Sequence, residues 1–251
     1  MNKDLNIFIA CHKQCELPNK DCYIPLHVGA EGKKDLGFTK DSTGENISLK
    51  NPNYCELTGL YWMWKNTKSK YIGLVHYRRY FFKKNREHSL KDIISKEDII
   101  NILNDYDVIV PKKTKLIGLT TREQFSKYHN VKDYDICKDV IKEKYPDYVE
   151  AFDTVSNRKY FYAFNMCIMN KKSFDNYCKW LFDILFEVEK RVDMSNYTDY
   201  EKRLFGFLSE RLFNVWLEKN NLKLKELAVY NVDDNYFKQC VISVIKDIIV
   251  H

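Results

Sequence analysis

Two adjacent arginines with a histidine and a tyrosine form the densest group of chemically active side chains in the sequence. In the run YIGLVHYRRYFF, residues 71–82, His76, Tyr77, Arg78 and Arg79 follow an apolar stretch. If that stretch is a strand, these side chains stand at its carboxyl end, where open α/β sheets bind ligands. A guanidinium group can donate two parallel hydrogen bonds to phosphate, so the run predicts an anion site. A solvated basic turn is the alternative interpretation.

A glutamate on a later helix could supply acid–base chemistry. Arg203, Gly206 and Glu210 are spaced by three and four residues, which places them on one stripe of a helix. An apolar setting would tune the pKa of Glu210 for a general base, and Gly206 would leave room for a ligand. The alternative is an ion pair between Glu210 and Arg211 on a polar helix face.

A long polar loop is predicted at residues 29–51, which are rich in Gly, Asp, Asn, Ser and Lys. Long irregular loops in compact domains are commonly functional. Its segment GFTKDSTGENIS carries Asp41, Asn46 and Ser48, whose short polar side chains could bind the hydroxyl groups of a ribose or hexose. A plain surface loop fits the same composition.

The following segment, NYCELTGLYWMWKN, predicts a helix over residues 53–66. Asn51 and Pro52 provide a cap and a first helical residue. Because its large apolar side chains cover nearly all sides, this helix is expected to be buried. Glu56 and Lys65 then need partners or a function, since a buried charge is costly.

Metal ligands show no standard pattern. The cysteines and histidines of residues 11–27 match no zinc finger or ribbon spacing. Asp-Tyr-Asp triplets at 105–107 and 133–135 precede a predicted strand and open a predicted helix, which indicates caps or turns. We therefore predict no cofactor, and a divalent Mn²⁺ or Mg²⁺ beneath a diphosphate is the less favoured alternative.

The elements that position these residues follow from hydrophobic periodicity. Ser95 with Asp98, and Thr121 with Gln124, have the spacing of boxes that open helices. Predicted strands cover residues 6–10, 24–28, 71–75, 107–111, 164–169 and 224–229. Predicted helices cover residues 53–66, 95–104, 133–145, 173–192 and 199–219, with one more opening at 121.

This order predicts one α/β domain over residues 1–251, with an α/β part over about 1–115 and a mainly helical part over about 116–251. The composition, 45% hydrophobic and 30% charged, is that of a globular protein. A net charge of +6 favours anionic partners: nucleotide diphosphates, acidic lipid surfaces or nucleic acid.

The ends of the sequence bear on localisation. The N-terminus is polar, and no apolar run approaches about 18 residues, which predicts a cytosolic protein with reduced thiols. The final segment, residues 241–251, is amphipathic. It could dock on the core, which we favour, or lie on a membrane surface as a peripheral contact.

Several segments together resemble a known family. The segments are CHK, DSTGENIS, NPNYCELTGLYWMWKN, IGLVHYRRYF, YDVIVPKK, FNMCIM, YCKWLFDILFEVE and GFLSERL. They occur in the order seen in the domain of unknown function numbered 4422, and the resemblance covers residues 5–230 approximately. Members of that family are bacterial glycosyltransferases of capsule and exopolysaccharide assembly, some described as galactofuranosyltransferases.

The resemblance implies a compact GT-A-like (Rossmann-type) fold that binds nucleotide sugars. The expected activity is inverting transfer of a hexose from a UDP-sugar to a glycan or lipid-linked oligosaccharide. The sequence lacks the well-placed Asp-x-Asp of the usual GT-A pattern and carries HYRR instead, which puts metal dependence in question.

Twelve positions match the family motifs, and they receive roles on that basis. Glu210 is the expected general base, with His76 as a second catalytic residue. The expected diphosphate-binding residues are Arg78, Arg79 and Lys13. The expected nucleoside- and sugar-binding residues are His12, Asp41, Asn46, Ser48, Glu56, Asn165 and Arg203.

The rival class is a non-catalytic module that binds RNA or glycan through the basic and aromatic run at 76–82. Acidic residues accompany the basic ones along the whole chain, which argues against a nucleic-acid partner. A phosphoryl-transfer enzyme is disfavoured because the chain has no Gly-rich loop with Lys and Ser or Thr.

Overall fold

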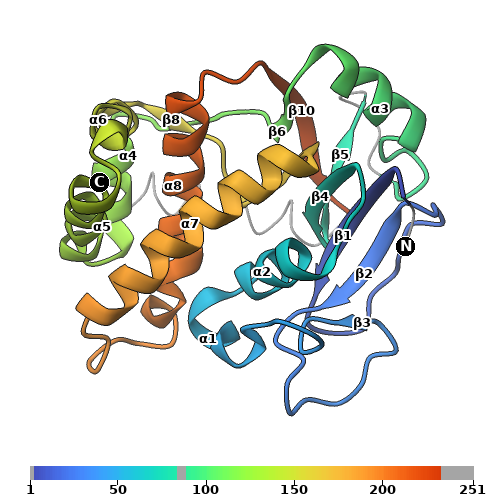
Figure 1. Cartoon of the computed structure of the whole chain (residues 1–251), viewed down its shortest axis with the longest axis horizontal. Coiled ribbons are helices and arrows are strands. Elements are labelled where there is room, and N and C mark those ends of the chain that lie inside the picture. The colour runs from blue at the N-terminus through green and yellow to red at the C-terminus, as the bar shows by residue number, and fades with distance from the viewer. Residues whose placement is uncertain (1–2, 84–88, 233–251) are drawn as a thin grey trace, which may run out of the picture.

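One mixed sheet lies in the right-hand half of the molecule in Figure 1, with most of the helices to its left. The computed structural model describes residues 3–83 and 89–232. Within them the sheet has eight strands: β1 (Leu5–Cys11), β2 (Tyr23–His27), β3 (Thr39–Lys40), β4 (Tyr71–His76), β5 (Arg79–Phe82), β6 (Val108–Pro111), β9 (Cys167–Asn170) and β10 (Leu224–Asn231). A separate short pair joins β7 (Thr114–Lys115) to β8 (Tyr160–Phe161).

The strand order brings several carboxyl ends to the same edge. β3, β2, β1 and β4 are parallel neighbours, with Cys11 opposite His27 and Ala10 opposite His76. β9 lies antiparallel between β4 and β6, and β10 follows parallel to β6. β5 pairs antiparallel with β10 and meets β4 only where His76 faces Arg79. The residues that follow β1, β2 and β4 are therefore neighbours in space.

Each face of the sheet is covered by its own apolar cluster. Successive side chains of a strand point to opposite faces. In β1, Phe8 and Ala10 accordingly join one cluster, whereas Ile7 and Ile9 join the other. This two-sided burial explains why the central strands are apolar throughout.

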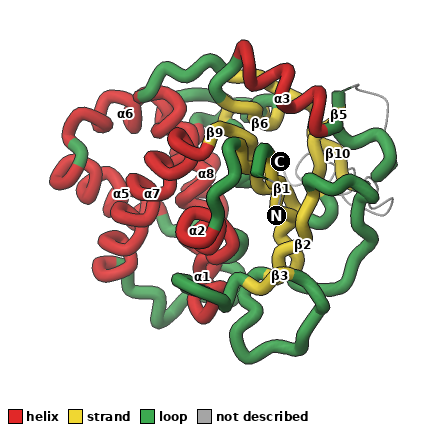
Figure 2. The backbone as a smooth tube through the Cα atoms, turned by 45° about the vertical axis from the view of Figure 1, so that its right-hand side comes forward, coloured by secondary structure: helices red, strands yellow, loops and turns green. Residues whose placement is uncertain are grey.

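Helices cover the two faces unequally (Figures 1 and 2). One face of the sheet is covered by the helix α3 (Lys96–Asp105). Its Ile99 and Leu103 belong to the smaller of the two apolar clusters. The other face carries α1 (Asn51–Tyr54), α2 (Leu57–Asn66), α7 (Lys171–Arg191) and α8 (Leu204–Lys219). Beyond these lie α4 (Thr121–Tyr128), α5 (Val131–Lys144) and α6 (Val149–Asn157). Short 3-10 turns occur at Ser48–Lys50, Pro146–Tyr148 and Glu201–Arg203.

The predicted strands are all confirmed, although β9 begins three residues later than expected because residues 164 and 165 form a left-handed turn. The helix expected over 53–66 is interrupted at Cys55, whose backbone is also left-handed. The cap of α4 is Thr120 paired with Glu123, one residue before the predicted Thr121. The helix α6 was not predicted.

Both halves of the chain contribute to one sheet. β9 and β10 come from the half expected to be mainly helical, and β9 sits between two strands of the first half. In the described ranges, no helix is long and apolar enough to cross a bilayer. The amphipathic segment 241–251 lies outside the described residues.

Candidate active site

A cavity of about 500 Å³ opens at the carboxyl ends of β1 and β4. A second cavity, of about 220 Å³, adjoins it and shares Cys55, Glu56, His76, Arg79 and Arg203 with its wall. We call the first the arginine cavity and the second the inner cavity. Elements far apart in sequence therefore meet here: the β4–β5 turn, the α1–α2 junction and the start of α8.

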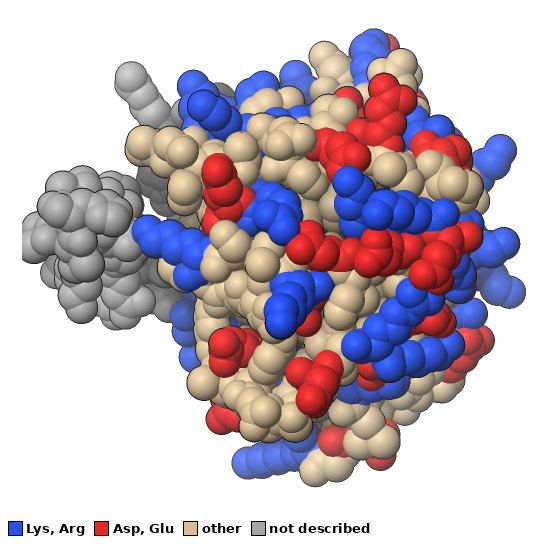
Figure 3. Space-filling view, turned by 90° about the vertical axis from the view of Figure 1, so that its left-hand side faces the viewer, with Lys and Arg blue, Asp and Glu red and all other residues tan. Residues whose placement is uncertain are grey.

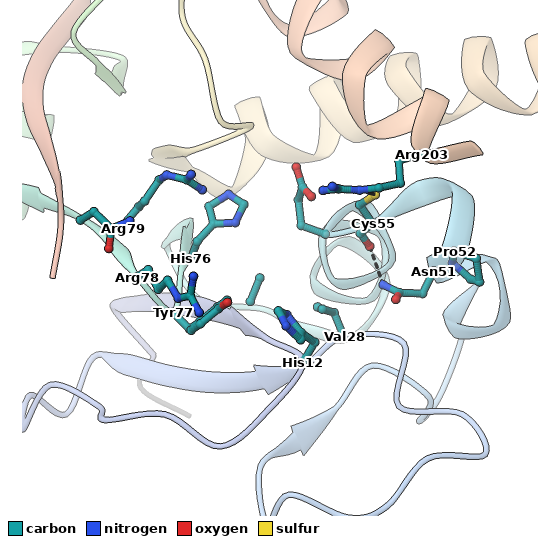
Figure 4. A pocket seen from close by; sticks show the side chains of 13 residues that line it. His12, Val28, Asn51, Pro52, Cys55, His76, Tyr77, Arg78, Arg79 and Arg203 are labelled. Carbon is teal, nitrogen blue, oxygen red and sulfur yellow. Dashed lines mark hydrogen bonds between the residues drawn. The ribbon is translucent and has the colours of Figure 1, made fainter. Parts of the chain in front are cut away.

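Three guanidinium groups make the arginine cavity a site for anions. Arg78 and Arg79 come from the β4–β5 turn, and Arg203 comes from the turn before α8. Figure 4 shows Arg79 and Arg203 reaching toward the cavity from opposite walls. Their Cζ atoms lie 4.8 Å and 5.5 Å from the ring centroids of Phe164 and Phe207, and such stacking orients a guanidinium group.

His76 is a neutral hydrogen-bond acceptor in this site. Its Nε2 lies 2.7 Å from the carbonyl oxygen of Phe164. A carbonyl can only accept, so Nε2 carries the proton and Nδ1 keeps a lone pair in the neutral ring. Burial lowers the pKa of His76 below its ordinary value, which keeps the ring neutral at neutral pH. The lone pair on Nδ1 can accept a hydrogen bond from a sugar hydroxyl. It cannot bond to an ionised phosphate, whose oxygens are themselves acceptors.

Glu56 is held in place from behind. Nδ2 of Asn165 donates to Oε1 of Glu56 at 2.7 Å and to the carbonyl oxygen of Gly206 at 3.0 Å. The hydroxyl of Ser209 donates to Oδ1 of Asn165 at 3.0 Å. Asn165 is only 5% exposed and lines neither cavity, so its position supports Glu56 rather than touching a ligand.

Glu210 is a largely buried carboxylate at the far wall of the inner cavity. Its Oε1 accepts the backbone N–H of Phe164 at 2.9 Å, and its Oε2 accepts from Nη1 of Arg211 at 2.9 Å. Burial raises the pKa of Glu210, and Arg211 works against that rise. A carboxylate has about four acceptor positions, so two remain for a hydroxyl group or another donor.

Backbone strain converges on the inner cavity. Cys55 has φ 52° and ψ −130°, a conformation that favours glycine, and Phe164 and Asn165 have φ 77° and 51°. Strain of this kind is retained when the surroundings fix it, and it is common at functional sites. Cys55 directly precedes Glu56, and the Phe164 N–H donates to Glu210, so both strained turns carry contacts of the inner cavity wall. A Cβ on Gly206 would lie 3.3 Å from Cys55 Sγ. The absence of a side chain at Gly206 therefore leaves room for the Cys55 side chain, and Gly206 also lines the inner cavity.

Two residues predicted to bind the nucleoside or sugar are buried in the structure. Asp41 is 0% exposed, and its carboxylate accepts from the N–H groups of Gly29 and Ala30 at 2.7 Å and 3.0 Å. The hydroxyl of Ser48, which is 2% exposed, donates to the same carboxylate at 2.5 Å. Neither side chain lines the arginine or the inner cavity. Their contacts tie residues 29 and 30, just after β2, to residues 41 and 48 of the same loop, which we propose is their role.

The remaining predicted residues lie at the rim or outside. His12 lines the arginine cavity and packs edge-on against Tyr77, with ring centroids 5.0 Å apart. Burial and then the charge of Lys13 lower the pKa of His12. Lys13 is exposed, with Nζ 5.7 Å from the Tyr77 ring centroid. Asn46 bonds within its own loop, to Gly44 and the Ser48 amide, and lines neither cavity.

The aspartate triplets stand apart from both cavities. Asp107 accepts the backbone N–H of Lys223 at 2.7 Å, and Asp135 forms an ion pair with Arg122 at 2.8 Å. These contacts agree with the interpretation of the triplets as turn and helix-end residues. Lys65 also has a local partner, because its Nζ lies 2.8 Å from the carboxylate of Glu45. Of the two charged residues predicted on the buried helix, Glu56 is therefore the one that lines the cavities.

Sequence reasoning missed Cys55 and Phe164 as site residues. Nothing in their residue types signals a left-handed backbone, because glycine is the usual choice there. Tyr77 stood inside the predicted anion run and now lines the cavity between His12 and Arg78. Only the convergence of β4, α2 and α8 shows that these side chains share one site.

The fold and site define an α/β protein with an arginine-rich cavity at the carboxyl ends of parallel strands, beside a buried carboxylate. The chain belongs to the family described as a domain of unknown function (DUF4422), whose model matches residues 6–221. The predicted resemblance over about residues 5–230 is thereby confirmed.

Among solved structures, the chain is similar to the WbbM bifunctional glycosyltransferase in its apo form. The two share 32% sequence identity with a TM-score of 0.85, over 92% of this chain and 45% of that chain. The chain thus spans less than half of that protein. Among curated proteins, no relative matches the sequence.

Proposed function

We propose that this protein is a glycosyltransferase that moves a hexose from a UDP-sugar to a glycan acceptor. The observation that carries the proposal is the arginine cavity, which adjoins a buried carboxylate and a neutral histidine at the carboxyl ends of parallel strands. The similarity to a protein named as a glycosyltransferase, over 92% of this chain, supports the same class.

The strand arrangement supports a GT-A-like fold. β3, β2, β1 and β4 form a parallel half, as the nucleotide-binding half of such a fold would, and the antiparallel β9 joins it to β6. In such sheets a ligand lies beyond the carboxyl ends of the strands. That is where the arginine cavity opens, so we assign the donor to it.

The donor diphosphate is assigned to Arg78, Arg79 and Arg203, with exposed Lys13 as a fourth positive charge at the rim. Preorganised positive groups stabilise a departing diphosphate electrostatically. His12 and Glu56 face the nucleoside and the sugar. His76, as a neutral acceptor, binds a sugar hydroxyl, and Asn165 keeps Glu56 in position for the same purpose.

Glu210 is assigned as the general base. The oxygen of the acceptor hydroxyl forms a bond to the anomeric carbon of the donor while the bond from that carbon to the diphosphate oxygen breaks. The electron pair of the broken bond stays on the UDP, and the acceptor proton passes to Glu210. A single displacement of this kind inverts the anomeric configuration.

The donor set at the diphosphate position suits an anion better than a divalent cation. Hard cations such as Mg²⁺ prefer several oxygen ligands. The arginine cavity offers three guanidinium groups and the carboxylate of Glu56. We therefore propose that the arginines supply the charge neutralisation that a metal provides in other transferases.

The proposed acceptor and its place in the cell rest on the resemblance to the family. A lipid-linked oligosaccharide of capsule or exopolysaccharide assembly is the proposed acceptor. A net charge of +6 would favour peripheral contact with an anionic inner membrane face.

The surface argues against the alternative of an RNA-binding module. On the face shown in Figure 3, basic and acidic side chains are interspersed rather than separated. Oppositely charged side chains of the described residues also form ion pairs, such as Arg191 with Glu143 at 2.6 Å and Lys144 with Asp183 at 2.6 Å. A backbone-tracking nucleic-acid site needs a continuous basic surface.

The test is thermal stabilisation by a panel of nucleotides and nucleotide sugars, with and without EDTA. We expect a shift with one UDP-sugar that EDTA leaves unchanged, and loss of that shift in Arg78→Ala, with turnover reduced by orders of magnitude. A shift that vanishes with EDTA would overturn the metal-free mechanism. Near-normal turnover by Arg78→Ala would remove the phosphate role, and salt-sensitive RNA binding without any nucleotide shift would favour the rival class.

A further inference from the structure

A third cavity, of about 290 Å³, shares Glu210 with the inner cavity and no lining residue with the arginine cavity. Its wall is aromatic: Tyr128 and His129 end α4, Tyr200 precedes the turn before α8, and Phe207 belongs to α8. We call it the aromatic cavity. None of the functional assignments above uses these four residues to bind a ligand.

The aromatic rings form a stacked platform. The rings of His129 and Tyr200 lie 5.5 Å apart with an interplanar angle of 13°. The ring of Phe207 is 4.2 Å from that of His129 and 5.2 Å from that of Tyr200. Each ring is thus oriented by its neighbours, so the platform keeps one shape without a ligand.

One ring of the platform and a second tyrosine of the cavity wall also expose apolar area that a folded chain normally buries. Tyr200 is 50% exposed and Tyr128 is 43% exposed. The other strongly exposed large apolar side chains in the described ranges, Leu49 and Ile117, line none of these cavities. Exposed aromatic rings gathered in a concave site are typical of ligand binding.

The charge of the aromatic cavity differs from that of the arginine cavity. Burial, together with the nearby Arg211, lowers the pKa of His129 to about 4, so its ring is neutral at neutral pH. Arg211 is 2% exposed and is neutralised by Glu210 at 2.9 Å. Apart from the Arg211–Glu210 ion pair, the wall offered to a ligand is therefore neutral and largely aromatic, which suits a neutral sugar ring rather than a phosphate.

The aromatic cavity is continuous with the reaction site. Phe164, Phe207 and Glu210 line both the aromatic and the inner cavity. A molecule bound on the platform would present one end to Glu210 without occupying the arginine cavity. That is the geometry needed by a base that takes a proton from an acceptor hydroxyl.

We propose that the aromatic cavity is the acceptor subsite and that it binds a neutral saccharide by stacking its C–H faces on Tyr200 and Tyr128. This inference rests on the proposed transferase function, since it assigns the second substrate of the same reaction. The acceptor sugar lies between the platform and Glu210, and its nucleophilic hydroxyl points into the inner cavity.

The test uses octyl glycosides of common hexoses as acceptor probes and UDP as the donor-site probe. Binding of each probe to the full chain is measured by saturation-transfer NMR and titration. We expect Tyr200→Ala and Tyr128→Ala to weaken glycoside binding up to about tenfold each. UDP affinity should be unchanged, and Tyr200→Phe should bind the glycosides like the wild type, because the stacking ring is kept.

Ile117→Ala is the matched control, since it removes an exposed apolar side chain outside the cavities. Glycoside binding that is absent from the wild type, or equal in Tyr200→Ala and Ile117→Ala with intact melting temperatures, would overturn the acceptor assignment. If glycosides bind on the platform but UDP does not bind at all, the saccharide subsite stands and the proposed donor site fails.

Discussion

The arginine cavity and the aromatic cavity each adjoin the inner cavity that contains Glu210, but they are built from different chemistry. One wall carries Arg78, Arg79 and Arg203, whereas the other carries stacked neutral rings around His129 and Tyr200. The difference fits a reaction in which a charged donor and a neutral acceptor reach one reaction centre, because each cavity would then favour binding of only one of the two substrates.

The two cavities also differ in how the chain builds them. The arginine cavity depends on strand ends and on loops held by buried polar contacts, such as the Asp41 carboxylate. The aromatic cavity depends on ring packing between α4 and α8. Changes in one should leave ligand binding in the other largely intact, and Glu210 is where they become coupled.

The largest effect is expected from Glu210→Gln. The amide keeps the shape but cannot take a proton, so kcat should fall by about 10²–10⁴-fold. Binding of UDP and of glycosides should persist, because each lies on a different wall. Steady-state kinetics and titrations check this, and full activity of the variant would remove Glu210 as the base.

Arg79→Ala should have the next largest effect, and only on the donor side. Loss of one preorganised positive group costs about 10²-fold in kcat. UDP binding should weaken as well, whereas glycoside binding should not change. Lys112→Ala removes a positive charge that lines neither the arginine nor the inner cavity and serves as the control. Equal losses for both probes would break the division between the cavities.

Asp41→Ala should destabilise the fold and affect only the arginine cavity. It leaves two buried N–H groups and a hydroxyl without their acceptor, which costs about 2–4 kcal/mol. Urea unfolding measures the loss, with exposed Asp35→Ala as control. UDP affinity should drop while glycoside affinity holds. Unfolding free energies that match the control would contradict the supporting role of Asp41.

The smallest effect concerns the pH profile. Burial raises the pKa of Glu210 above its ordinary value of 4.5, and a general base works only when ionised. Activity should therefore rise with pH through a midpoint above 4.5 and be lost on acidification below it. Burial lowers the pKa of His76, so its ring is already neutral at neutral pH, where Glu210 is needed as the ionised base. If the residual activity of Glu210→Gln falls at low pH in the same way as that of the wild type, the loss of activity at low pH is due to a group other than Glu210.

Much of the site was visible in the sequence because local chemistry was sufficient. The run from His76 to Arg79 follows an apolar strand, and open sheets place ligands at strand ends, so its location followed from residue types alone. Glu210 could be placed on the helix stripe of Arg203 for a similar reason. The roles of Asp41 and Ser48 could not, since composition does not distinguish a ligand-binding loop from a loop that binds its own backbone.

By itself, the sequence determined the α/β class, the positions of six strands of the central sheet, the family and the arginine pair, because these depend on periodicity and neighbouring residue types. The tertiary structure decided that Glu56, His76, Arg203 and Glu210 line one cavity. It also decided that the backbone of Cys55 and of Phe164 in its wall is left-handed. It also decided that rings from α4 and α8 form the platform beyond Glu210. Contacts between residues more than a hundred positions apart are set by how helices and strands pack, and local patterns carry no record of that packing.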